Sequence, residues 1–449
     1  MGKLFGTDGI RGVANVELTA ELAFRTGQSG AYVLTKQTDH RPRILIGKDT
    51  RKSGDMLEAA LTAGLCSMGA KVISLGIIPT PAVAYLTRLY GADAGVVISA
   101  SHNPCEYNGI KFFNSEGYKL KDEIEDEIEA YIKGEKKIDE LPTHGKIGYV
   151  ATNHNAVEDY VNFAVSTIDC RLDGIKIAID CANGASYQTA FKALNKLGAS
   201  VEAIHNTPDG VNINAMCGST HMESLQSYVT SIGADVGLAF DGDADRVLAV
   251  DEKGNIIDGD QIMAACAKYM KDSGKLEKDT LVATVMSNLG LFIAGENEGI
   301  NIPRTKVGDR YVLEEMLDKG YVLGGEQSGH IIFLEHNTTG DGLVSALQFL
   351  AVLKKTGQTA SEAAGLVKIL PQVLCNAKVK PENKNTYMEN EKIAGIINDL
   401  EAEFDGAGRV LIRPSGTEPL VRVMIEGSDI DYITKKAQDL AELIERVLG

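Results

Sequence analysis

The chain has 449 residues, about three times the length of a typical domain, so several hydrophobic cores are expected. Hydrophobic residues make up 44% and charged residues 24%, which is the balance of a globular protein and excludes a disordered chain. The formal net charge of −17 argues against nucleic acid or anionic membrane as a partner, because both require basic surface.

The N-terminal residues MGKLFGTDGI lack the apolar segment of a signal peptide, and no apolar run reaches the roughly 20 residues that span a bilayer. The chain has seven scattered cysteines and no CxxC spacing. They are Cys66, Cys105, Cys170, Cys181, Cys217, Cys266 and Cys375. We therefore expect free thiols and a cytoplasmic protein without a membrane partner.

One order of elements is predicted three times, over residues 43–76, 175–204 and 280–299. In each case an apolar β-branched run is followed by a turn with Gly, Asp or Asn, an amphipathic stretch and another apolar run. Strand, turn, helix and strand in this order predict parallel or mixed sheets covered by helices.

The pattern changes after about residue 366. Helices are predicted over residues 391–404 and 432–449, and strands over 408–414 and 420–427, which indicates a smaller α+β domain. The expected fold class is therefore α/β, with three similar α/β/α units and a C-terminal α+β domain around a central cleft. The predicted domains are residues 1–153, 154–253, 254–368 and 369–449.

Three carboxylates, Asp241, Asp243 and Asp245, alternate in the segment DGDADR between two predicted strands. Carboxylates at this spacing in an extended segment project to one side, where they repel one another unless a cation binds. Oxygen ligands that leave room for a phosphate suit Mg²⁺. The segment is predicted to bind a metal, and the alternative is an acidic surface turn.

Ser101 follows the apolar segment DAGVVIS in SASHNP, at a strand end where α/β enzymes place their chemistry. A hydrolase with His102 as the base is a weak interpretation, because adjacent residues rarely face each other on a loop and no GxSxG segment is present. From these residues alone, Ser101 is either a nucleophile or a turn residue.

Two glycine-containing loops offer polar groups. The segment RPSGTEP provides Arg413 and hydroxyl and backbone N–H groups, and Arg422 lies on the following strand, which suits a phosphate. The segment GGEQSGH provides a carboxylate, an amide and a hydroxyl, which suit sugar hydroxyl groups. The alternative for this second loop is a solvated glycine turn.

Together with GTDGIRG at residues 6–12 and NGIKFF at residues 108–113, these motifs resemble the α-D-phosphohexomutase family in content and order, over essentially the whole chain. Within the family they are most similar to the bacterial branch that acts on glucosamine phosphates, where Gln327 stands in place of a Met. Cys105 and Glu106 depart from the aromatic-bearing stretch that usually follows SASHNP, which leaves the shape of that loop open.

The resemblance implies a role for each matching residue. Ser101 carries the phosphoryl group and shares one Mg²⁺ per chain with Asp241, Asp243 and Asp245. His102, Arg11 and Lys111 are implied to be catalytic residues that steer the phosphate or assist proton movement. The residues implied to bind the substrate are Glu326, Ser328, His330, Arg413, Ser415, Gly416, Thr417 and Arg422.

The implied reaction interconverts glucosamine 6-phosphate and glucosamine 1-phosphate through a sugar 1,6-bisphosphate, on the route to UDP-N-acetylglucosamine. The sequence leaves the oligomeric state open, with a homodimer as one candidate. Three alternatives remain: a mutase for glucose or mannose phosphates, a metal-dependent phosphatase, and a non-catalytic sugar-phosphate sensor. A sensor has no need to retain Ser101 together with all three aspartates.

Overall fold

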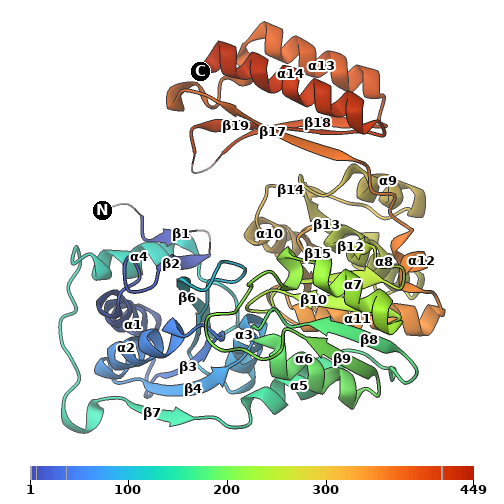
Figure 1. Ribbon diagram of the computed structural model, residues 1–449. Helices are drawn as coiled ribbons and strands as arrows, with labels where there is room; N and C mark the ends of the chain where they lie inside the picture. Colours follow the sequence, from blue (N-terminus) through green and yellow to red (C-terminus); the bar gives the residue numbers. More distant parts are fainter. Residues whose placement is uncertain (1–2, 7, 37, 416–417) are drawn as a thin grey trace. The chain divides into compact units, whose positions relative to one another are not determined.

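The structure is a computed structural model that describes residues 3–6, 8–36, 38–415 and 418–449 (Figure 1). The chain divides into two compact units, one made of Met1–Met286 with Ile300–Leu366 and the other of Ser287–Gly299 with Val367–Gly449. Among the described residues, no helix is both long and apolar enough to cross a bilayer.

The first sheet of the larger unit has seven strands in the order β1-β2-β6-β5-β3-β4-β7. Its strands are β1 (Phe5–Gly6), β2 (Gly9–Val13), β3 (Arg43–Lys48), β4 (Lys71–Ile77), β5 (Ala94–Ile98), β6 (Tyr107–Asn114) and β7 (Tyr149–Thr152). Its helices are α1 (Ala20–Leu34), α2 (Ser53–Ser67), α3 (Thr80–Leu89) and α4 (Asp122–Ile132). β3 and β4 run parallel and are joined by α2, as the sequence predicts for residues 43–76.

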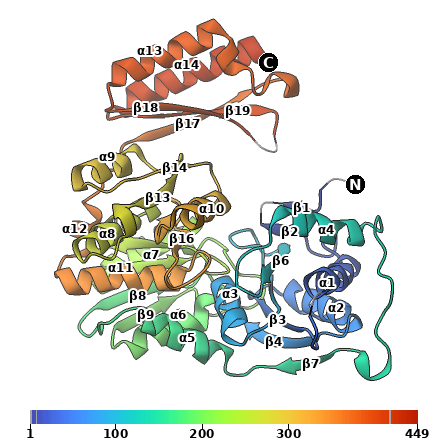
Figure 2. The ribbon, with the colours of Figure 1, turned by 180° about the vertical axis from the view of Figure 1, so that it is seen from behind.

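Alternation along the strands separates two faces of this sheet. Ile44 and Ile46 point into a core shared with α1, α2 and α4. These three helices lie near one another in both ribbon views (Figures 1 and 2). Gly47 points to the opposite face, where a Cβ atom would lie 2.5 Å from Cγ2 of Val83 on α3. The sheet is therefore covered by helices on both faces.

The second sheet has the order β12-β11-β10-β8-β9. Its strands are β8 (Lys176–Asp180), β9 (Ser200–Ile204), β10 (Val236–Phe240), β11 (Val247–Asp251) and β12 (Ile256–Ile257), and its helices are α5 (Ala156–Ser166), α6 (Ser186–Lys196) and α7 (Glu223–Ile232). β8 and β9 are parallel and joined by α6, which confirms the second predicted repeat. β11 runs antiparallel to β10, so the sheet is mixed.

The third sheet has four strands in the order β14-β13-β15-β16, with β13 parallel to both of its neighbours. Its elements are β13 (Leu281–Thr284), β14 (Arg304–Thr305), β15 (Leu323–Gly325), β16 (Ile331–Phe333), α8 (Gly259–Asp272), α10 (Asp309–Lys319), α11 (Gly342–Thr356) and α12 (Ala360–Ala364). Asp258 and Gln261 form a capping box that starts α8.

The smaller unit has an antiparallel sheet in the order β17-β19-β18. It contains β17 (Gln372–Lys378), β18 (Arg409–Pro414), β19 (Leu420–Glu426), α9 (Leu289–Glu298), α13 (Glu391–Phe404) and α14 (Ile430–Leu448). The two helices and two strands predicted after residue 390 are confirmed. β17 was not predicted, because its apolar residues Val373, Leu374 and Cys375 are consecutive in the sequence and show no period of two.

Candidate active site

Ser101 lies just beyond the carboxyl end of β5, and Asp241 directly follows β10 of the second sheet. The Ser101 hydroxyl donates a hydrogen bond of 2.7 Å to Oδ2 of Asp241. Its side chain is only 1% exposed, and its backbone is left-handed with φ of +52°. The structure thus brings the predicted nucleophile and the first carboxylate of the acidic segment into direct contact.

The fully buried side chain of Arg51 organises the Ser101 loop from inside the first domain. Its guanidinium donates to the Ser101 carbonyl at 2.9 Å and also to the carbonyls of Asn103, Pro104 and Tyr107. Asp49 accepts from Nε of Arg51 at 2.8 Å and from the Ser99 hydroxyl at 2.6 Å. Arg51 therefore fixes carbonyl groups along the loop from Ser101 to Tyr107, the loop that contains the unusual residues Cys105 and Glu106.

The second domain supports the same loop. The side-chain amide of Asn214 donates to the carbonyls of Ser101 at 2.9 Å and Asn103 at 3.0 Å. Gly242 packs so closely on this loop that a Cβ atom would lie 2.5 Å from the Ser101 carbonyl oxygen. Glycine between the aspartates therefore allows the two loops to approach each other.

The three aspartates are buried, and one oxygen of each lies within 4.8 Å of the others. Asp243 accepts from Thr80 Oγ1 at 2.6 Å and Lys111 Nζ at 3.1 Å. Burial and the charges of Asp245 and Asp243 hold the pKa of Asp241 well above its usual range. Burial also opposes ionisation of Asp243, but Lys111 and Thr80 outweigh it and lower the pKa of this carboxyl.

Lys111 is buried and belongs to a partly buried network of alternating charges. Its Nζ lies 2.8 Å from Asp8, which also accepts from Nζ of Lys119 at 2.8 Å. Lys119 in turn donates to Asp309 of α10 at 2.6 Å. Burial opposes ionisation of both carboxyls, but the lysines outweigh it, lowering the pKa of Asp309 to about 2 and holding the pKa of Asp8 well below its usual range. The network holds Lys111 charged beside the acidic segment.

The predicted histidines and Arg11 lie around the same network. His330 is buried, with Nδ1 3.6 Å from Asp245 and Nε2 accepting from the Gly340 N–H at 3.1 Å. Nδ1 of His102 lies 3.4 Å from Oγ of Ser101, so these adjacent side chains do face each other, contrary to our expectation. Arg11 pairs with Asp8, which places its guanidinium at the edge of the site.

The predicted sugar loop connects β15 and β16. Glu326 is half-buried and accepts from the Gly308 N–H at 3.1 Å, whereas Ser328 is exposed. The Gln327 amide donates to Asp258 at 3.0 Å, at the start of α8. Gln327 therefore supports the shape of the loop from behind, and Glu326 and Ser328 are the side chains left for a ligand.

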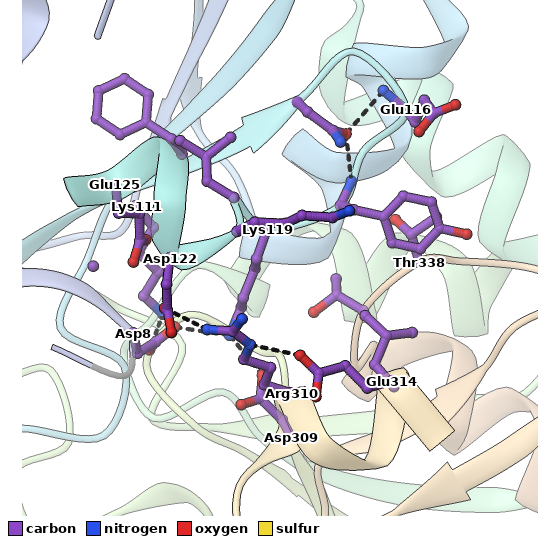
Figure 3. A pocket seen from close by; sticks show the side chains of 18 of the residues that line it. Asp8, Lys111, Glu116, Lys119, Asp122, Glu125, Asp309, Arg310, Glu314 and Thr338 are labelled. Atoms are coloured by element: carbon purple, nitrogen blue, oxygen red, sulfur yellow. Dashed lines mark hydrogen bonds and ion pairs between the residues drawn. The ribbon is translucent and has the colours of Figure 1, made fainter. Parts of the chain in front are cut away.

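A cavity of about 300 Å³ borders the Asp8, Lys111 and Lys119 network (Figure 3). Its other wall comes from α4 and α10, where Arg310 pairs with Asp122 and with Glu314. Arg310 is thus neutralised by nearby carboxylates in the structure.

The predicted phosphate loop lies in the smaller unit, between β18 and β19. Arg413 and Arg422 are direct cross-strand partners, and burial together with Arg422 lowers the pKa of Arg413. Ser415 is buried, and its hydroxyl accepts from the Glu418 N–H at 3.2 Å. Gly416 and Thr417 lie outside the described residues.

Several contributors to the site were not identified from the sequence. They are Asp8, Asp49, Arg51, Thr80, Lys119, Asn214 and Asp309. Two of them could have been found, because Asp49 and Arg51 lie within three residues of the end of a predicted strand, where polar residues of α/β folds gather.

Four family models match the chain in order, each described as a domain of phosphoglucomutase/phosphomannomutase. Domain I matches residues 2–139, domain II residues 156–254, domain III residues 258–369 and the C-terminal domain residues 374–443.

A protein from Ruminiclostridium cellulolyticum named phosphoglucosamine mutase is 65% identical over 99% of both chains. The fold is similar to that of a putative phosphomannomutase from Thermus thermophilus, with a TM-score of 0.78 and 24% identity over 98% of this chain and 99% of that one. It is also similar to Aspergillus fumigatus N-acetylphosphoglucosamine mutase in complex with GlcNAc-6P and magnesium, with a TM-score of 0.71 and 17% identity over 99% and 96% of the chains.

Proposed function

The chain belongs to the phosphoglucomutase/phosphomannomutase family, and we propose that within it the protein is a phosphoglucosamine mutase. It would interconvert glucosamine 6-phosphate and glucosamine 1-phosphate. The substrate assignment is supported by the name of the relative that is 65% identical over nearly the full length. The observation that carries the chemistry is the buried Ser101 hydroxyl, 2.7 Å from a carboxylate of the acidic segment.

We infer that the acidic segment holds Mg²⁺. The fit rests on two buried oxygens, Oδ1 of Asp243 and Oδ1 of Asp245, that have no hydrogen-bond partner among the described residues. Together with Asp241 they provide the hard oxygen donors that this ion prefers. When bound, Mg²⁺ would neutralise charge on the phosphoryl group as it is transferred.

In the proposed first step, a hydroxyl oxygen of the sugar forms a bond to the phosphorus of phospho-Ser101. The bond between phosphorus and Oγ breaks, the sugar hydroxyl loses its proton, and Oγ regains one. Asp241 would then accept a hydrogen bond from the restored Ser101 hydroxyl, the contact that the structure has between these two side chains. The product of this step is the 1,6-bisphosphate, and the second step returns its other phosphoryl group to Ser101.

The surrounding charges would position this transfer. The buried Lys111 is held by Asp8 and Asp243 and offers a fixed positive charge. We propose that Arg11, His102 and His330 complete the surroundings of the phosphoryl group. Fixed charges of this kind stabilise a transition state without having to reorganise during the reaction.

We further propose that Glu326 and Ser328 bind sugar hydroxyls and that the loop of Arg413 and Arg422 binds the phosphate that is not transferred. The two guanidinium groups repel each other across neighbouring strands, and Arg422 is only loosely paired with the exposed Glu418 at 3.6 Å, so a bound anion would relieve the repulsion, which supports this assignment. The roles of Ser415, Gly416 and Thr417 follow from their place in the same loop. The four domain boundaries and the homodimer remain predictions.

The proposal is tested by assaying the purified protein in parallel with glucosamine, glucose and mannose 6-phosphates. We expect the highest kcat/KM with the glucosamine substrate and a phosphoryl group on Ser101 by peptide mass analysis. The Ser101→Ala variant should lose both the mutase activity and the phosphoryl group. Equal turnover of glucose or mannose phosphate would assign the protein to those substrates instead, and activity retained in Ser101→Ala would exclude the mechanism.

A further inference from the structure

A second group of metal-ligand side chains lies in the second α/β sheet, and none of its members takes part in the site described above. Asp180 is the last residue of β8, His205 directly follows β9, and Cys217 precedes the short 3-10 helix Gly218–Thr220. One ligand atom from each residue lies within 4.8 Å of the others. The three segments are far apart in sequence, and the sheet brings their ends together.

The spacing of the ligand atoms approaches that of a tetrahedral metal site. Nδ1 of His205 lies 2.9 Å from Oδ2 of Asp180. With zinc bonds of about 2.0–2.1 Å to nitrogen or oxygen and about 2.3 Å to sulfur, tetrahedral ligand atoms lie about 3.3–3.6 Å apart. The hydrogen bond between His205 and Asp180 would therefore open by about 0.4 Å on metal binding, and the thiol, whose sulfur lies within 4.8 Å of both ligand atoms, would approach by little more than about 1 Å.

Hydrogen bonds already orient these side chains. The Ala182 and Gly218 N–H groups donate to the two oxygens of Asp180 at 2.8 and 2.9 Å. The Asn183 amide points toward Sγ of Cys217 at 4.0 Å. Metal ligands are commonly fixed by such outer partners, which aim the lone pairs and restrain the rotamers.

The burial of Cys217 distinguishes this cluster from the site of a reactive cysteine, whose thiol must be accessible. Asp180 and Cys217 are fully buried, so no substrate reaches the thiol, whereas the side chain of His205 is 30% exposed. A small ion could thus enter beside the imidazole and reach the other two ligands. All seven cysteines are free, which leaves Cys217 available for such a bond.

We propose that Asp180, His205 and Cys217 bind one divalent transition-metal ion with the preferences of Zn²⁺, at a site distinct from the three aspartates. A thiolate and an imidazole favour a borderline-soft ion over Mg²⁺, which prefers oxygen ligands alone. On binding, the thiol releases its proton to solvent. Solvent supplies the fourth ligand at the exposed side of His205.

The site lies on the segment that supports the nucleophile loop. Asn214, three residues before Cys217, donates to the carbonyls of Ser101 and Asn103. A metal that ties residue 217 to the ends of β8 and β9 would restrain this segment. The proposed ion is therefore structural, and its binding does not depend on the proposed mutase activity.

The test is a titration of the metal-free, reduced protein with Co²⁺ in the presence of excess Mg²⁺, which occupies the oxygen-only site. We expect a saturable thiolate-to-cobalt charge-transfer absorption at one equivalent, displaced by one equivalent of Zn²⁺. Cys217→Ser should abolish this absorption, whereas Cys266→Ser, which alters another buried cysteine on α8, should retain it.

His205→Gln provides a second variant at a partly exposed position, and circular dichroism checks that each variant is folded. This change should weaken Zn²⁺ binding at least about tenfold, the loss that even an orienting residue causes. Absence of a saturable absorption in the unmodified protein would overturn the proposal. An absorption that persists in Cys217→Ser, or an unchanged Zn²⁺ affinity in His205→Gln, would also overturn it.

Discussion

At the Ser101 loop, buried opposite charges hold one another in place, whereas at the Arg413 loop two like charges face each other across neighbouring strands. Arg51 and Asp49 are fully buried and bonded to each other, and Arg51 also donates to four loop carbonyls. Arg413 is half-buried opposite Arg422, and its pKa is lowered. The Ser101 loop is held by its own ion pair, whereas the Arg413 loop is the one proposed to bind an anion.

This difference fits the tasks proposed for the two loops. A nucleophile must present one oxygen at one place, so rigidity established during folding is useful. An anchor that binds a phosphate in two orientations of the sugar gains from donors that remain available until the anion arrives. Substitutions at the two loops should therefore change different properties.

The largest effect is expected at the acidic segment that faces Ser101. Asp243→Asn preserves shape but removes a charge that Lys111 and the proposed metal site both use. We expect kcat to fall by at least about 100-fold, the loss typical of one electrostatic catalytic group. Steady-state kinetics across a Mg²⁺ series measure this, with circular dichroism as the check on folding. If the Asp243→Asn variant keeps full activity and a chelator does not inhibit the unmodified protein, the metal assignment is contradicted.

The next effect concerns stability at the Ser101 loop. Arg51→Ala leaves Asp49 buried without its partner, and we expect the larger unit to lose about 3–5 kcal/mol in the free energy of unfolding. Urea denaturation followed by circular dichroism measures the loss. Lys52→Ala, at the exposed neighbouring position, should change it by less than about 0.5 kcal/mol. Equal effects of the two substitutions would show that the loop is not organised from within.

At the other loop, binding should change while stability does not. Arg413→Ala removes one charge-assisted phosphate contact, worth about 1.5–3 kcal/mol or roughly 10- to 100-fold in kcat/KM. Both reaction directions should be impaired, since the same loop is proposed to bind either phosphate. Initial rates with glucosamine 6-phosphate and glucosamine 1-phosphate provide the measurement.

Arg409→Ala on the same strand is the control for this variant. Arg409 pairs with the buried Glu426, so its loss should destabilise the smaller unit. Arg413→Ala should not lower that stability, because it relieves repulsion from Arg422. Impairment of a single reaction direction, or a large loss of stability in Arg413→Ala, would remove the contrast between the loops.

The smallest effect concerns Glu125, a carboxyl whose pKa is raised mainly by burial. Burial, assisted by Asp122, raises the pKa of Glu125 to about 7 from an ordinary value of 4.5. The folded state therefore binds this proton more tightly, and the stability that it contributes is fully present below about pH 4.5 and is lost as the pH rises through about 7.

Glu125→Gln cannot ionise, so we expect it to stabilise the protein at pH 8 by up to about 1 kcal/mol, allowing for solvent screening, and to have little effect at pH 5. Urea unfolding at the two pH values measures the difference. Glu123→Gln, at an exposed position of α4, should stay within about 0.5 kcal/mol at both. Equal effects of Glu125→Gln at pH 5 and pH 8 would exclude a raised pKa.

Local pattern was sufficient for much of the fold and for selecting the candidate site residues. Apolar runs and glycine turns identified the parallel units around β3 and β8, and the C-terminal helices and strands followed from the same signals. β17 was missed because its apolar residues are consecutive in the sequence, so that the alternation of its exposed positions became visible only in the folded sheet. Ser101 and the three aspartates stood out because each follows an apolar strand, where the chain leaves the sheet.

The sequence by itself determined which residue types are available for phosphate and metal chemistry, since DGDADR and SASHNP carry their donors within six residues. Only the tertiary structure decided which residues hold them: Arg51 and Asn214 reach Ser101 from 50 and 113 residues away. The Asp180, His205 and Cys217 cluster likewise has no sequence spacing to reveal it. The physical reason is that hydrogen bonds and ion pairs depend on distance in space, and folding alone brings the ends of separate strands together.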